Sequence, residues 1–434
     1  MDRIIEGKRS IRGEITVPGD KSISHRAVIF ASIAQGTSTI GGLSSSRDVR
    51  STIQAMLKVG VSIDQREENT VVEGKGITGF EQLRAAEPIE IDCENSGTTA
   101  RLLTGLFGGA GIPARLIGDE SLMKRPMGRV VDPLGRIGVR LTSNNGYLPV
   151  EILGGAPAPF DYTLPVASAQ VKTAFILAAL FIAGSSVITE TMQTRDHTER
   201  MLVLMDGDIR TRTTLQGKSI IITGRRELSP LSLRVPGDIS SAVFFIAAAL
   251  VSPSSDIMIR NVLLNPTRSH IIEVFQRMGG DIQVERVDEF PEPCGHIRVR
   301  SSNLRGTRVG GVEIPIMIDE IPALAAAACF AKGETVIQGA SELRVKESDR
   351  IAGVVDMVRR FGGRVEELED GLVISKKMKP TGTEVESFGD HRLAMAASII
   401  ALNARGRTTI KGTECVDISF PEYFDLLDAI TTVR

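Results

Sequence analysis

The sequence has few of the residues that redox, disulfide or metal chemistry requires. The four cysteines are scattered and share no C-x-x-C spacing: Cys93, Cys294, Cys329 and Cys415. This argues against a disulfide framework or a zinc site and favours a reducing compartment. The histidines at 25, 197 and 391 also lack metal-ligand spacing. We therefore expect no metal and no cofactor, and a cytoplasmic protein.

Further absences narrow the class of protein. There is no GxGxxG or GxxxxGK[ST] phosphate loop and no nucleophile elbow, which disfavours nucleotide-driven and acyl-enzyme chemistry. Lys and Arg number 51 against 53 Asp and Glu, a formal net charge of −2, so overall charge favours neither nucleic acid nor an anionic membrane. The most apolar stretch, Thr173 to Gly184, is shorter than the ~20 residues of a membrane span. The N-terminal MDRIIEGKRS lacks the apolar run of a signal peptide.

One short motif is present twice. VPGD begins at Val17 and again at Val235, each time ahead of a serine-containing apolar segment. Each copy predicts a strand with a Pro-Gly bend that leads into a helix. A chain of 434 residues fits two domains of roughly 200 residues each. We predict one domain at 20–235 and a second formed by 1–19 with 236–434.

Within these domains, six Ala-rich apolar segments recur at nearly even spacing, and each opens with residues that favour a helix N-terminus. They start near Lys21, Asn95, Ser168, Asp238, Asp319 and Asp390. Because their apolar residues lie all round, these helices should be buried on every side. Five should end near a glycine: Gly36, Gly109, Gly184, Gly333 and Gly406. A β-type run and usually an amphipathic helix follow each, which predicts an α/β fold.

The predicted amphipathic helices nearly all open with a cation. These cations are Arg47, Arg125, Arg195, Arg268 and the Lys346/Arg350 pair. Any single one is readily explained as a solvated charge. However, cations oppose the helix dipole at this position, so their repetition calls for a compensating anion. Arginines beside several helix N-termini favour phosphate and carboxylate groups. The pattern predicts small, multiply charged anionic substrates.

Differences between the repeated segments indicate which residues are functional candidates. Only the first VPGD continues as Lys-Ser-Ile-Ser-His-Arg, which makes Lys21, Ser22 and Arg26 functional candidates; Ser22 and Arg26 share one helix face. In ENSGTTAR, Gly97 either belongs to an ordinary cap or lets a phosphate approach the backbone. Asp319, at the head of a buried apolar helix, is either an N-cap or a desolvated acid or base.

Eight motifs, in order over almost the whole chain, closely resemble those of the EPSP synthases, the 3-phosphoshikimate 1-carboxyvinyltransferases. They are VPGDKSISHRA, NSGTTARLL, KRPMGRV, ASAQVKTA, RDHTER, MIDEIPALA, RVKESDRI and GDHRLAMA. The resemblance implies an α/β (α+β) fold of two similar domains. Each would hold three βαβαββ units with buried helices inside and sheet outside, an inside-out α/β barrel, and the active site would lie in the interdomain cleft.

The resemblance further implies transfer of the enolpyruvyl group of phosphoenolpyruvate to the 5-hydroxyl of shikimate 3-phosphate, through a tetrahedral ketal, by a monomer. Implied shikimate 3-phosphate ligands are Lys21, Ser22, Arg26, Ser168, Ala169, Gln170, Arg195, Asp319 and Lys346. Implied phosphoenolpyruvate ligands are Lys21, Asn95, Gly97, Arg125, Gln170, Arg350 and Arg392. Asp319 would be the base and Glu347 the acid, with Lys21 between the substrates. Closure would hinge at Gly19–Asp20 and Pro236–Gly237.

Three alternatives remain open at this point. The enolpyruvyl transferase acting on UDP-N-acetylglucosamine uses a mobile-loop cysteine, whereas this chain has GDESLMKRPMG there. An RNA 3′-phosphate cyclase calls for a basic, aromatic RNA surface, against 4% aromatic residues and no tryptophan. A non-enzymatic repeat scaffold would leave Lys21, Asp319 and Glu347 unexplained.

Overall fold

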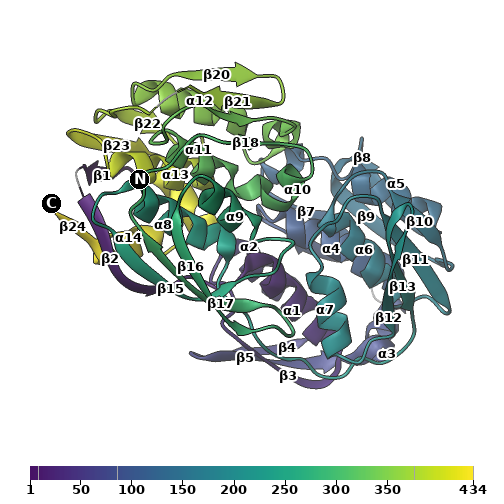
Figure 1. The fold of residues 1–434 in the computed structure, drawn as a ribbon. Coiled ribbons are helices and arrows are strands. Elements are labelled where there is room, and N and C mark those ends of the chain that lie inside the picture. Colours follow the sequence, from purple (N-terminus) through teal and green to yellow (C-terminus); the bar gives the residue numbers. More distant parts are fainter. Residues whose placement is uncertain (8, 86, 376, 434) are drawn as a thin grey trace. The chain divides into compact units, whose positions relative to one another are not determined.

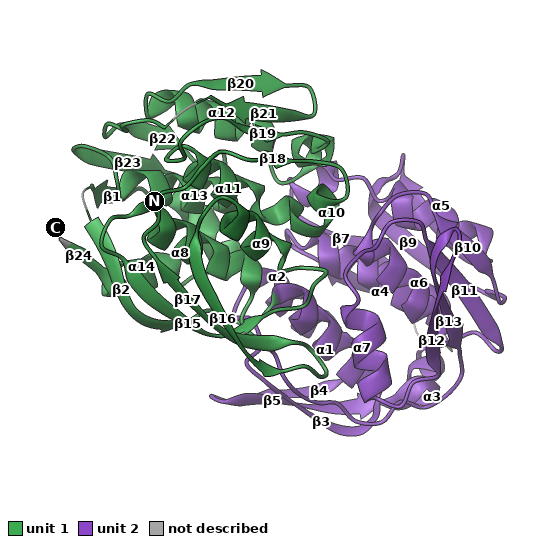
Figure 2. Ribbon diagram, in the orientation of Figure 1, with its two compact units in different colours: residues 1–20, 236–434 green, residues 21–235 purple. Residues whose placement is uncertain are grey.

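The computed structural model describes residues 1–7, 9–85, 87–375 and 377–433 (Figure 1). Two compact units divide the chain (Figure 2). Unit 1 consists of Met1–Asp20 and Pro236–Arg434, and unit 2 consists of Lys21–Val235. The chain therefore passes from unit 1 into unit 2 directly after the first VPGD motif and returns within the second, between Val235 and Pro236.

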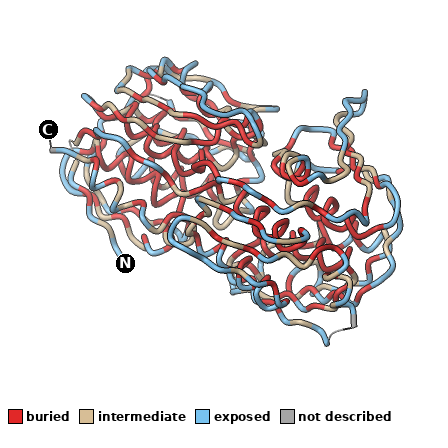
Figure 3. Tube along the Cα trace, turned by 90° about the horizontal axis from the view of Figure 1, so that it is seen from below, coloured by how far each residue is buried: buried red, intermediate tan, exposed pale blue. Residues whose placement is uncertain are grey.

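The six apolar segments form buried helices, as predicted. In unit 2 they are α1 (Lys21–Ile33), α4 (Gly97–Ala110) and α6 (Ala169–Ala179), and in unit 1 α8 (Ile239–Val251), α11 (Ile321–Ala328) and α13 (His391–Ala401). In unit 1, α8, α11 and α13 contact one another at the centre of one hydrophobic core. Figure 3 shows the buried residues gathered in the interior of each unit. Helices that are apolar all round lose most free energy if exposed, so they occupy these interiors.

Three four-stranded sheets belong to unit 2, in the orders β14-β3-β5-β4, β6-β7-β9-β8 and β10-β11-β13-β12. In each, the first two strands are parallel and the others antiparallel. In two of these sheets a buried helix connects the parallel strands, α4 between β6 and β7 and α6 between β10 and β11, and in all three a hairpin completes the sheet. The strands are β3 (Gln35–Gly41), β4 (Ser62–Gln65), β5 (Asn69–Lys75), β6 (Ile89–Asp92), β7 (Ala114–Ile117), β8 (Val139–Asn144), β9 (Tyr147–Gly155), β10 (Asp161–Leu164), β11 (Ser185–Glu190), β12 (Ile209–Thr214), β13 (Gly217–Thr223) and β14 (Ser232–Arg234).

The sheets of unit 1 repeat this plan in the orders β18-β19-β21-β20, β16-β17-β15-β2-β24 and β1-β23-β22. The N-terminal strand β1 pairs antiparallel with β23 and so completes the last sheet. The strands are β1 (Arg3–Glu6), β2 (Arg9–Thr16), β15 (Asp256–Leu263), β16 (Asp281–Asp288), β17 (Cys294–Arg300), β18 (Arg308–Val309), β19 (Thr335–Ile337), β20 (Val365–Leu368), β21 (Gly371–Ile374), β22 (Glu384–Glu386), β23 (Arg407–Lys411) and β24 (Thr431–Val433).

The remaining helices correct the sequence-based boundaries. They are α2 (Arg47–Lys58), α3 (Gly76–Gln82), α5 (Gly128–Arg136), α7 (His197–Leu204), α9 (His270–Arg277), α10 (Glu313–Met317), α12 (Arg350–Arg360) and α14 (Tyr423–Ile430), with 3₁₀ turns η1 (Leu83–Ala85), η2 (Leu122–Lys124), η3 (Ile318–Glu320), η4 (Ser341–Val345) and η5 (Thr413–Ile418). Arg125, Arg195 and Arg268 lie in the loops before their helices, so only Arg47 and Arg350 are first helical residues. The dipole argument therefore applies directly to two of the cations.

The two VPGD motifs join strands and helices of different units. Strand β2 pairs parallel with β15 of unit 1, yet the helix that follows it, α1, belongs to unit 2. Conversely β14 pairs with β3 of unit 2, and its following helix α8 belongs to unit 1. The two motifs meet in unit 1, where Asp20 N donates to Pro236 O at 2.8 Å and Asp238 N donates to Pro18 O at 2.8 Å. A Cβ on Gly237 would lie 2.8 Å from Val17 Cγ2, so the crossing requires glycine there.

Glycines allow close packing of α4 on α6. The sequence predicted that this helix ends near Gly109, and α4 ends one residue later, at Ala110, capped by Gly111 in the left-handed region, φ 72°. Gly105 and Gly109 instead face α6: a Cβ would lie 2.2 Å from Ala174 O at the first position and 2.4 Å from Ala178 Cα at the second. These glycines allow the two helix backbones to approach.

We therefore predict that Gly105→Ala strongly destabilises the protein, because the new methyl group would overlap the backbone of α6 and force the helices apart. Thermal unfolding would show a lower Tm than for the unchanged chain. Gly135→Ala in α5 is the matched control, since its Cβ would meet nothing within 4 Å and alanine favours a helix by up to about 1 kcal/mol over glycine. Equal Tm values for the two variants would contradict the packing argument.

Candidate functional site

The candidate residues form two groups, one in each unit. In unit 2, the start of α1 carries Lys21 and Ser22. Lys21 Nζ lies 2.6 Å from Asp48 Oδ2, on the first turn of α2, and Arg195 Nη1 donates to Ser22 Oγ at 3.0 Å. The structure thus brings together the predicted residues Lys21, Ser22 and Arg195. The sequence analysis did not single out Asp48, because an acidic residue near a helix N-terminus is usually explained by its favourable interaction with the helix dipole.

Arg26 is buried and makes several hydrogen bonds within unit 2. Arg26 is 2% exposed. Its guanidinium donates to Thr198 Oγ1 at 2.8 Å, to Thr173 Oγ1 at 2.7 Å and to the Ser22 carbonyl at 2.8 Å. A longer contact of 3.5 Å reaches the carbonyl of Ala169. Arg26 therefore ties the starts of α1, α6 and α7 together.

Gln170 belongs to a hydrogen-bonded group that includes one residue missed from the sequence. Its amide donates to Thr98 Oγ1 at 2.9 Å and accepts from Arg101 Nη1 at 2.9 Å. Arg101 also donates to the Gly97 carbonyl at 3.4 Å, and a Cβ on Gly97 would lie 2.8 Å from Arg101 Nη1. Arg101 thus links the predicted residues Gly97 and Gln170. The signal available was its position four residues after Gly97 on the same helix face.

The remaining predicted residues of unit 2 lie at helix starts and in the adjoining loop. Arg125 Nη2 donates to Asn95 Oδ1 at 2.8 Å, and Asn95 Nδ2 donates to Asp119 Oδ2 at 2.7 Å. Ser168 caps α6, where its hydroxyl accepts from Val171 N at 3.4 Å, and Ala169 is the first residue of that helix. Asn95 and Arg125 thus form one polar group, and Ser168 and Ala169 form the start of α6.

In unit 1, the second group is centred on Asp319 in the turn η3. Lys346 Nζ lies 3.7 Å and Arg350 Nη1 3.4 Å from Asp319 Oδ1. Arg392 Nη1 donates to the Asp319 carbonyl at 2.8 Å. Asp319 is not the N-cap of α11, which begins at Ile321 with Glu320 at that position. Its side chain is therefore held by cations rather than by a helix end.

Arg350 is the centre of charge in this group. It is 1% exposed, and besides Asp319 it contacts Glu347 Oε2 at 2.5 Å and Asp390 Oδ2 at 2.7 Å. Burial opposes its charge, but the carboxylates of Asp390, Glu347 and Asp319 raise the pKa of Arg350 above its usual value. Burial likewise favours the neutral form of Asp390, but the charge of Arg350 outweighs it, and the pKa of Asp390 lies below its usual value.

The comparisons with known proteins agree over nearly the whole chain. Residues 5–427 match the family model described as EPSP synthase (3-phosphoshikimate 1-carboxyvinyltransferase). The chain belongs to the EPSP synthase family. It is 45% identical to the 3-phosphoshikimate 1-carboxyvinyltransferase of Pelotomaculum thermopropionicum, over 98% of both chains, and 45% identical to that of Geobacillus kaustophilus, over 96% of both.

Solved structures extend the comparison to the fold. An EPSP synthase from Acinetobacter baumannii is 38% identical, with a TM-score of 0.87 over 99% of both chains. The enolpyruvyl transferase NikO from Streptomyces tendae, at 16% identity, shares the fold with a TM-score of 0.76 over 99% of this chain and 98% of its own. The expected fold is thus confirmed. The expected function is confirmed as well: the chain is a transferase of the shikimate pathway that transfers the carboxyvinyl group of phosphoenolpyruvate to shikimate 3-phosphate.

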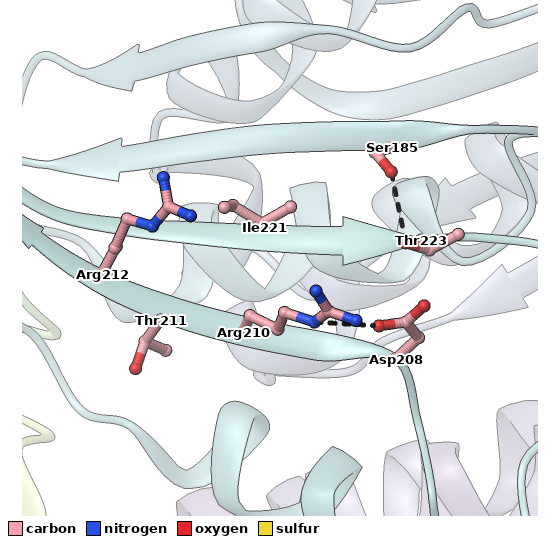
Figure 4. Close-up of a pocket in the computed structure, with 7 residues that line it drawn as sticks. All are labelled: Ser185, Asp208, Arg210, Thr211, Arg212, Ile221 and Thr223. Atoms are coloured by element: carbon pink, nitrogen blue, oxygen red, sulfur yellow. Dashed lines mark hydrogen bonds and ion pairs between the residues drawn. The ribbon is translucent and has the colours of Figure 1, made fainter.

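A pocket of about 290 Å³ lies away from the predicted residues of this EPSP synthase family member. It lies on the sheet of β11, β12 and β13 and is lined by Ser185, Asp208, Arg210, Thr211, Arg212, Ile221 and Thr223 (Figure 4). None of the sequence-predicted site residues lines it. Arg210 and Asp208 form an ion pair at 3.7 Å there, with both groups directed along the sheet surface. We assign it no part in the reaction.

The cysteines lie in buried surroundings that disfavour the reactive thiolate form. All four are buried, and burial raises the pKa of Cys329 to about 12 and that of Cys415 to about 11. A thiol with such a pKa is a poor nucleophile near neutral pH. Among the described residues, no group of three or more His, Cys, Asp or Glu side chains is arranged to hold a metal ion, and no described helix is both long and apolar enough to span a bilayer.

Directly beside Asp319, Glu320 belongs to a buried charge cluster around Arg268. Arg268 Nη2 lies 3.3 Å from Asp20 Oδ2 and 3.1 Å from Asp238 Oδ1, and Nη1 lies 3.6 Å from Glu320 Oε1. Arg268 also donates to Ser240 Oγ at 2.7 Å, and Ser240 donates to Glu320. One arginine thus holds the aspartates of both VPGD motifs and the residue next to the predicted base.

The cluster predicts a pH dependence of stability. Burial, and then the charge of Asp20, raise the pKa of Asp238 to about 6, whereas an unfolded aspartate titrates near about 3.9. The folded protein therefore holds this proton more tightly, so the stability that it contributes is fully present below about pH 4 and is lost as the pH rises through 6. Asp238→Asn keeps an oxygen for the cap to Ser240 N and removes the titration. We expect the fall in Tm between pH 4 and 6 to become shallower in this variant.

Tm measured by circular dichroism from pH 4 to 8 tests this expectation. Asp64→Asn is the control, because Asp64 is 60% exposed and pairs only with Arg66 among the described residues; its profile should follow that of the unchanged chain. If Asp238→Asn also followed that profile, the high proton affinity of Asp238 would be refuted.

Proposed function

We propose that the unit 2 group binds the shikimate 3-phosphate anion and that the unit 1 group carries out the proton transfers. The observation that carries this proposal is the gathering of Asp319, Lys346, Glu347 and Arg350 within one set of ion pairs. An acid, a base and two cations in mutual contact provide both proton-transfer groups and charge stabilisation. The membership of the chain in the EPSP synthase family sets the reaction in which they act.

In this proposal the phosphate of shikimate 3-phosphate is bound by Ser22, Arg195 and the start of α6 at Ser168 and Ala169. The hydrogen bond between Arg195 and Ser22 supports it, because it places a guanidinium and a hydroxyl side by side, both suited to a phosphate oxygen. Gln170 contacts both substrates. Arg26, which is buried, contributes by holding the carbonyls of Ser22 and Ala169 in place.

Phosphoenolpyruvate carries a carboxylate and a phosphate, and we propose that Arg125, Arg350 and Arg392 neutralise these charges. Asn95 and Gly97 line the same part of the site. Lys21 lies between the two substrates, once its ammonium group leaves Asp48 for the anions. Two oxyanionic substrates thereby replace the carboxylates that pair with these cations in the structure.

The chemistry then proceeds in two steps. In the first, Asp319 takes the proton of the 5-hydroxyl while Glu347 gives a proton to the methylene carbon, and a bond forms between O5 and C2 of phosphoenolpyruvate. In the second, the new methyl group returns a proton to Glu347, the bond between C2 and the phosphate oxygen breaks, and the leaving phosphate takes up the proton that Asp319 holds. The products are the enolpyruvyl ether and phosphate. Lys346, 3.7 Å from Asp319, stabilises negative charge on the reacting hydroxyl.

In this mechanism, the contact between Glu347 and Arg350 couples substrate binding to the protonation of Glu347. Paired with Arg350 at 2.5 Å, Glu347 is stabilised as a carboxylate. When a phosphoenolpyruvate anion takes over Arg350, Glu347 loses its cation and gains a negative neighbour, and both changes favour its protonated form. Binding of the substrate thus prepares the acid that the substrate needs.

These roles can be tested by measuring phosphate release from phosphoenolpyruvate with shikimate 3-phosphate in the presence of a metal chelator. Asp319→Asn and Glu347→Gln should each lower kcat by about 10²-fold or more, because each removes one proton-transfer group. The control is Asp356→Asn on α12, whose carboxylate pairs with Arg360 at the surface and whose loss should leave kcat unchanged.

A parallel reaction with UDP-N-acetylglucosamine should release no phosphate. Release with this substrate would contradict the assignment of the acceptor substrate. Full activity in either Asp319→Asn or Glu347→Gln would contradict the proton-transfer role of that residue. Full activity without added metal is expected, because the proposed charge stabilisation comes from Lys and Arg side chains alone.

Because the proposed ligands come from both units, we further propose that the units act as two domains of a cytoplasmic monomer that close around the substrates. The hinges would be Gly19–Asp20 and Pro236–Gly237, which lie in unit 1 directly beside the two points where the chain passes between the units. Small-angle scattering should show a smaller radius of gyration when both substrate anions are present. An unchanged radius, or a mass above that of one chain, would refute this part of the proposal.

A further inference from the structure

A second buried charge cluster lies in unit 2 and takes no part in the proposed chemistry. Lys172 Nζ on α6 lies 2.7 Å from Glu199 Oε1 on α7 and 3.1 Å from Glu190 Oε2 at the end of β11. The side chains of Lys172, Glu190 and Glu199 are 0%, 1% and 5% exposed. Ions so far from water are costly to bury even when paired, and apolar side chains of similar volume would serve stability as well. Their presence calls for a role other than stability.

The cluster is continuous with the loop that carries Arg195. Glu190 Oε2 also accepts from Thr194 Oγ1 at 2.8 Å, and Thr194, 7% exposed, directly precedes Arg195 in the chain. On the other side of the loop, Arg200 Nε donates to Asp196 Oδ2 at 3.0 Å. The segment 194–196 is therefore held on both sides, with Arg195 between the two attachments.

The same cluster joins the two helices that hold Arg26. Next to the Lys172–Glu199 pair, Thr173 and Thr198 are hydrogen-bonded at 2.8 Å, and both accept from Arg26. Two adjacent buried contacts thus fix α6 to α7. Through these contacts the starts of α1 and α6 and the loop before α7 are all linked to Lys172.

We infer that Lys172, Glu190, Glu199 and Thr194 form a positioning cluster that sets Arg195 for the phosphate of shikimate 3-phosphate. This inference rests on the proposed function, in which Arg195 and Ser22 bind that phosphate. Its physical basis is that Arg195 lies on a loop, where backbone freedom would otherwise be large, and a guanidinium displaced by about 1 Å loses its aligned hydrogen bonds. Glu190 restrains the loop through the hydroxyl of Thr194, and Lys172 holds Glu190.

The test uses Thr194→Val, which nearly conserves side-chain shape and removes the hydroxyl that binds Glu190. We expect KM for shikimate 3-phosphate to rise about tenfold, in keeping with the loss of a hydrogen bond to a charged group, while KM for phosphoenolpyruvate and kcat change less than about twofold. Thr194→Ser, which retains the hydroxyl, should restore the original KM. Tm is measured for each variant alongside the kinetics.

Thr189→Val is the matched control. Thr189 lies on β11 next to Glu190, is buried like Thr194 (5% against 7% exposed), and its hydroxyl contacts Ser219 at 3.0 Å rather than the cluster. It should leave both KM values unchanged. A rise in both KM values with a fall in Tm for Thr194→Val, unrelieved by Thr194→Ser, would mean a structural role only and would overturn the inference.

Arg195→Ala separates this inference from the proposed function on which it rests. If Arg195→Ala raises KM for shikimate 3-phosphate and Thr194→Val does not, the positioning role is wrong and the proposed site stands. If Arg195→Ala leaves that KM unchanged, the proposed phosphate site is itself wrong, and the inference falls with it.

Discussion

The arginine at position 268 is the contact on which the architecture of unit 1 depends. It lies in the loop before α9 and binds Asp20 and Asp238, the last residues of the two VPGD motifs, together with Glu320. Without this cation, three carboxylates would be buried side by side, which is strongly unfavourable. The same arginine therefore fixes where the chain leaves and re-enters unit 1 and, through Glu320, where Asp319 lies.

A second feature of the candidate site is that its cations form ion pairs with carboxylates of the protein. Lys21 pairs with Asp48, and Arg350 pairs with Glu347 and Asp390. This explains how a chain with a net charge of −2 can bind two multiply charged anions. The cations are held in position by carboxylates of the protein, and in the proposed mechanism the substrates displace some of these partners. Positions that stay fully buried, such as Asp390 and Lys172, hold the cations or helices in place.

Residue patterns predicted the elements better than their boundaries. The six buried helices could be predicted because an Ala-rich segment that is apolar on all sides has only one favourable location. Arg125, Arg195 and Arg268 were expected at the first turns of helices, yet they lie in the preceding loops. The helix expected to end near Gly109 does end there, but the capping residue is Gly111, and Gly109 itself lies inside α4 against Ala178. In both cases the position of the residue relative to its helix depends on a tertiary contact, to a polar partner or to a second helix. Such a contact cannot be predicted from the local sequence.

The sequence by itself determined the α/β class, the repeated unit, the two crossings at VPGD and, through eight motifs, the EPSP synthase family, because these follow from periodicity and from residue order along the chain. Only the tertiary structure decided which charges meet. Asp48 and Glu190 had no distinguishing local pattern, Arg101 was indicated only by its position four residues after Gly97, and the contacts of Arg26 with three helix starts appear only in the fold. Ion pairs and hydrogen bonds between residues far apart in the chain depend on how helices and sheets pack, and that packing is a property of the whole fold.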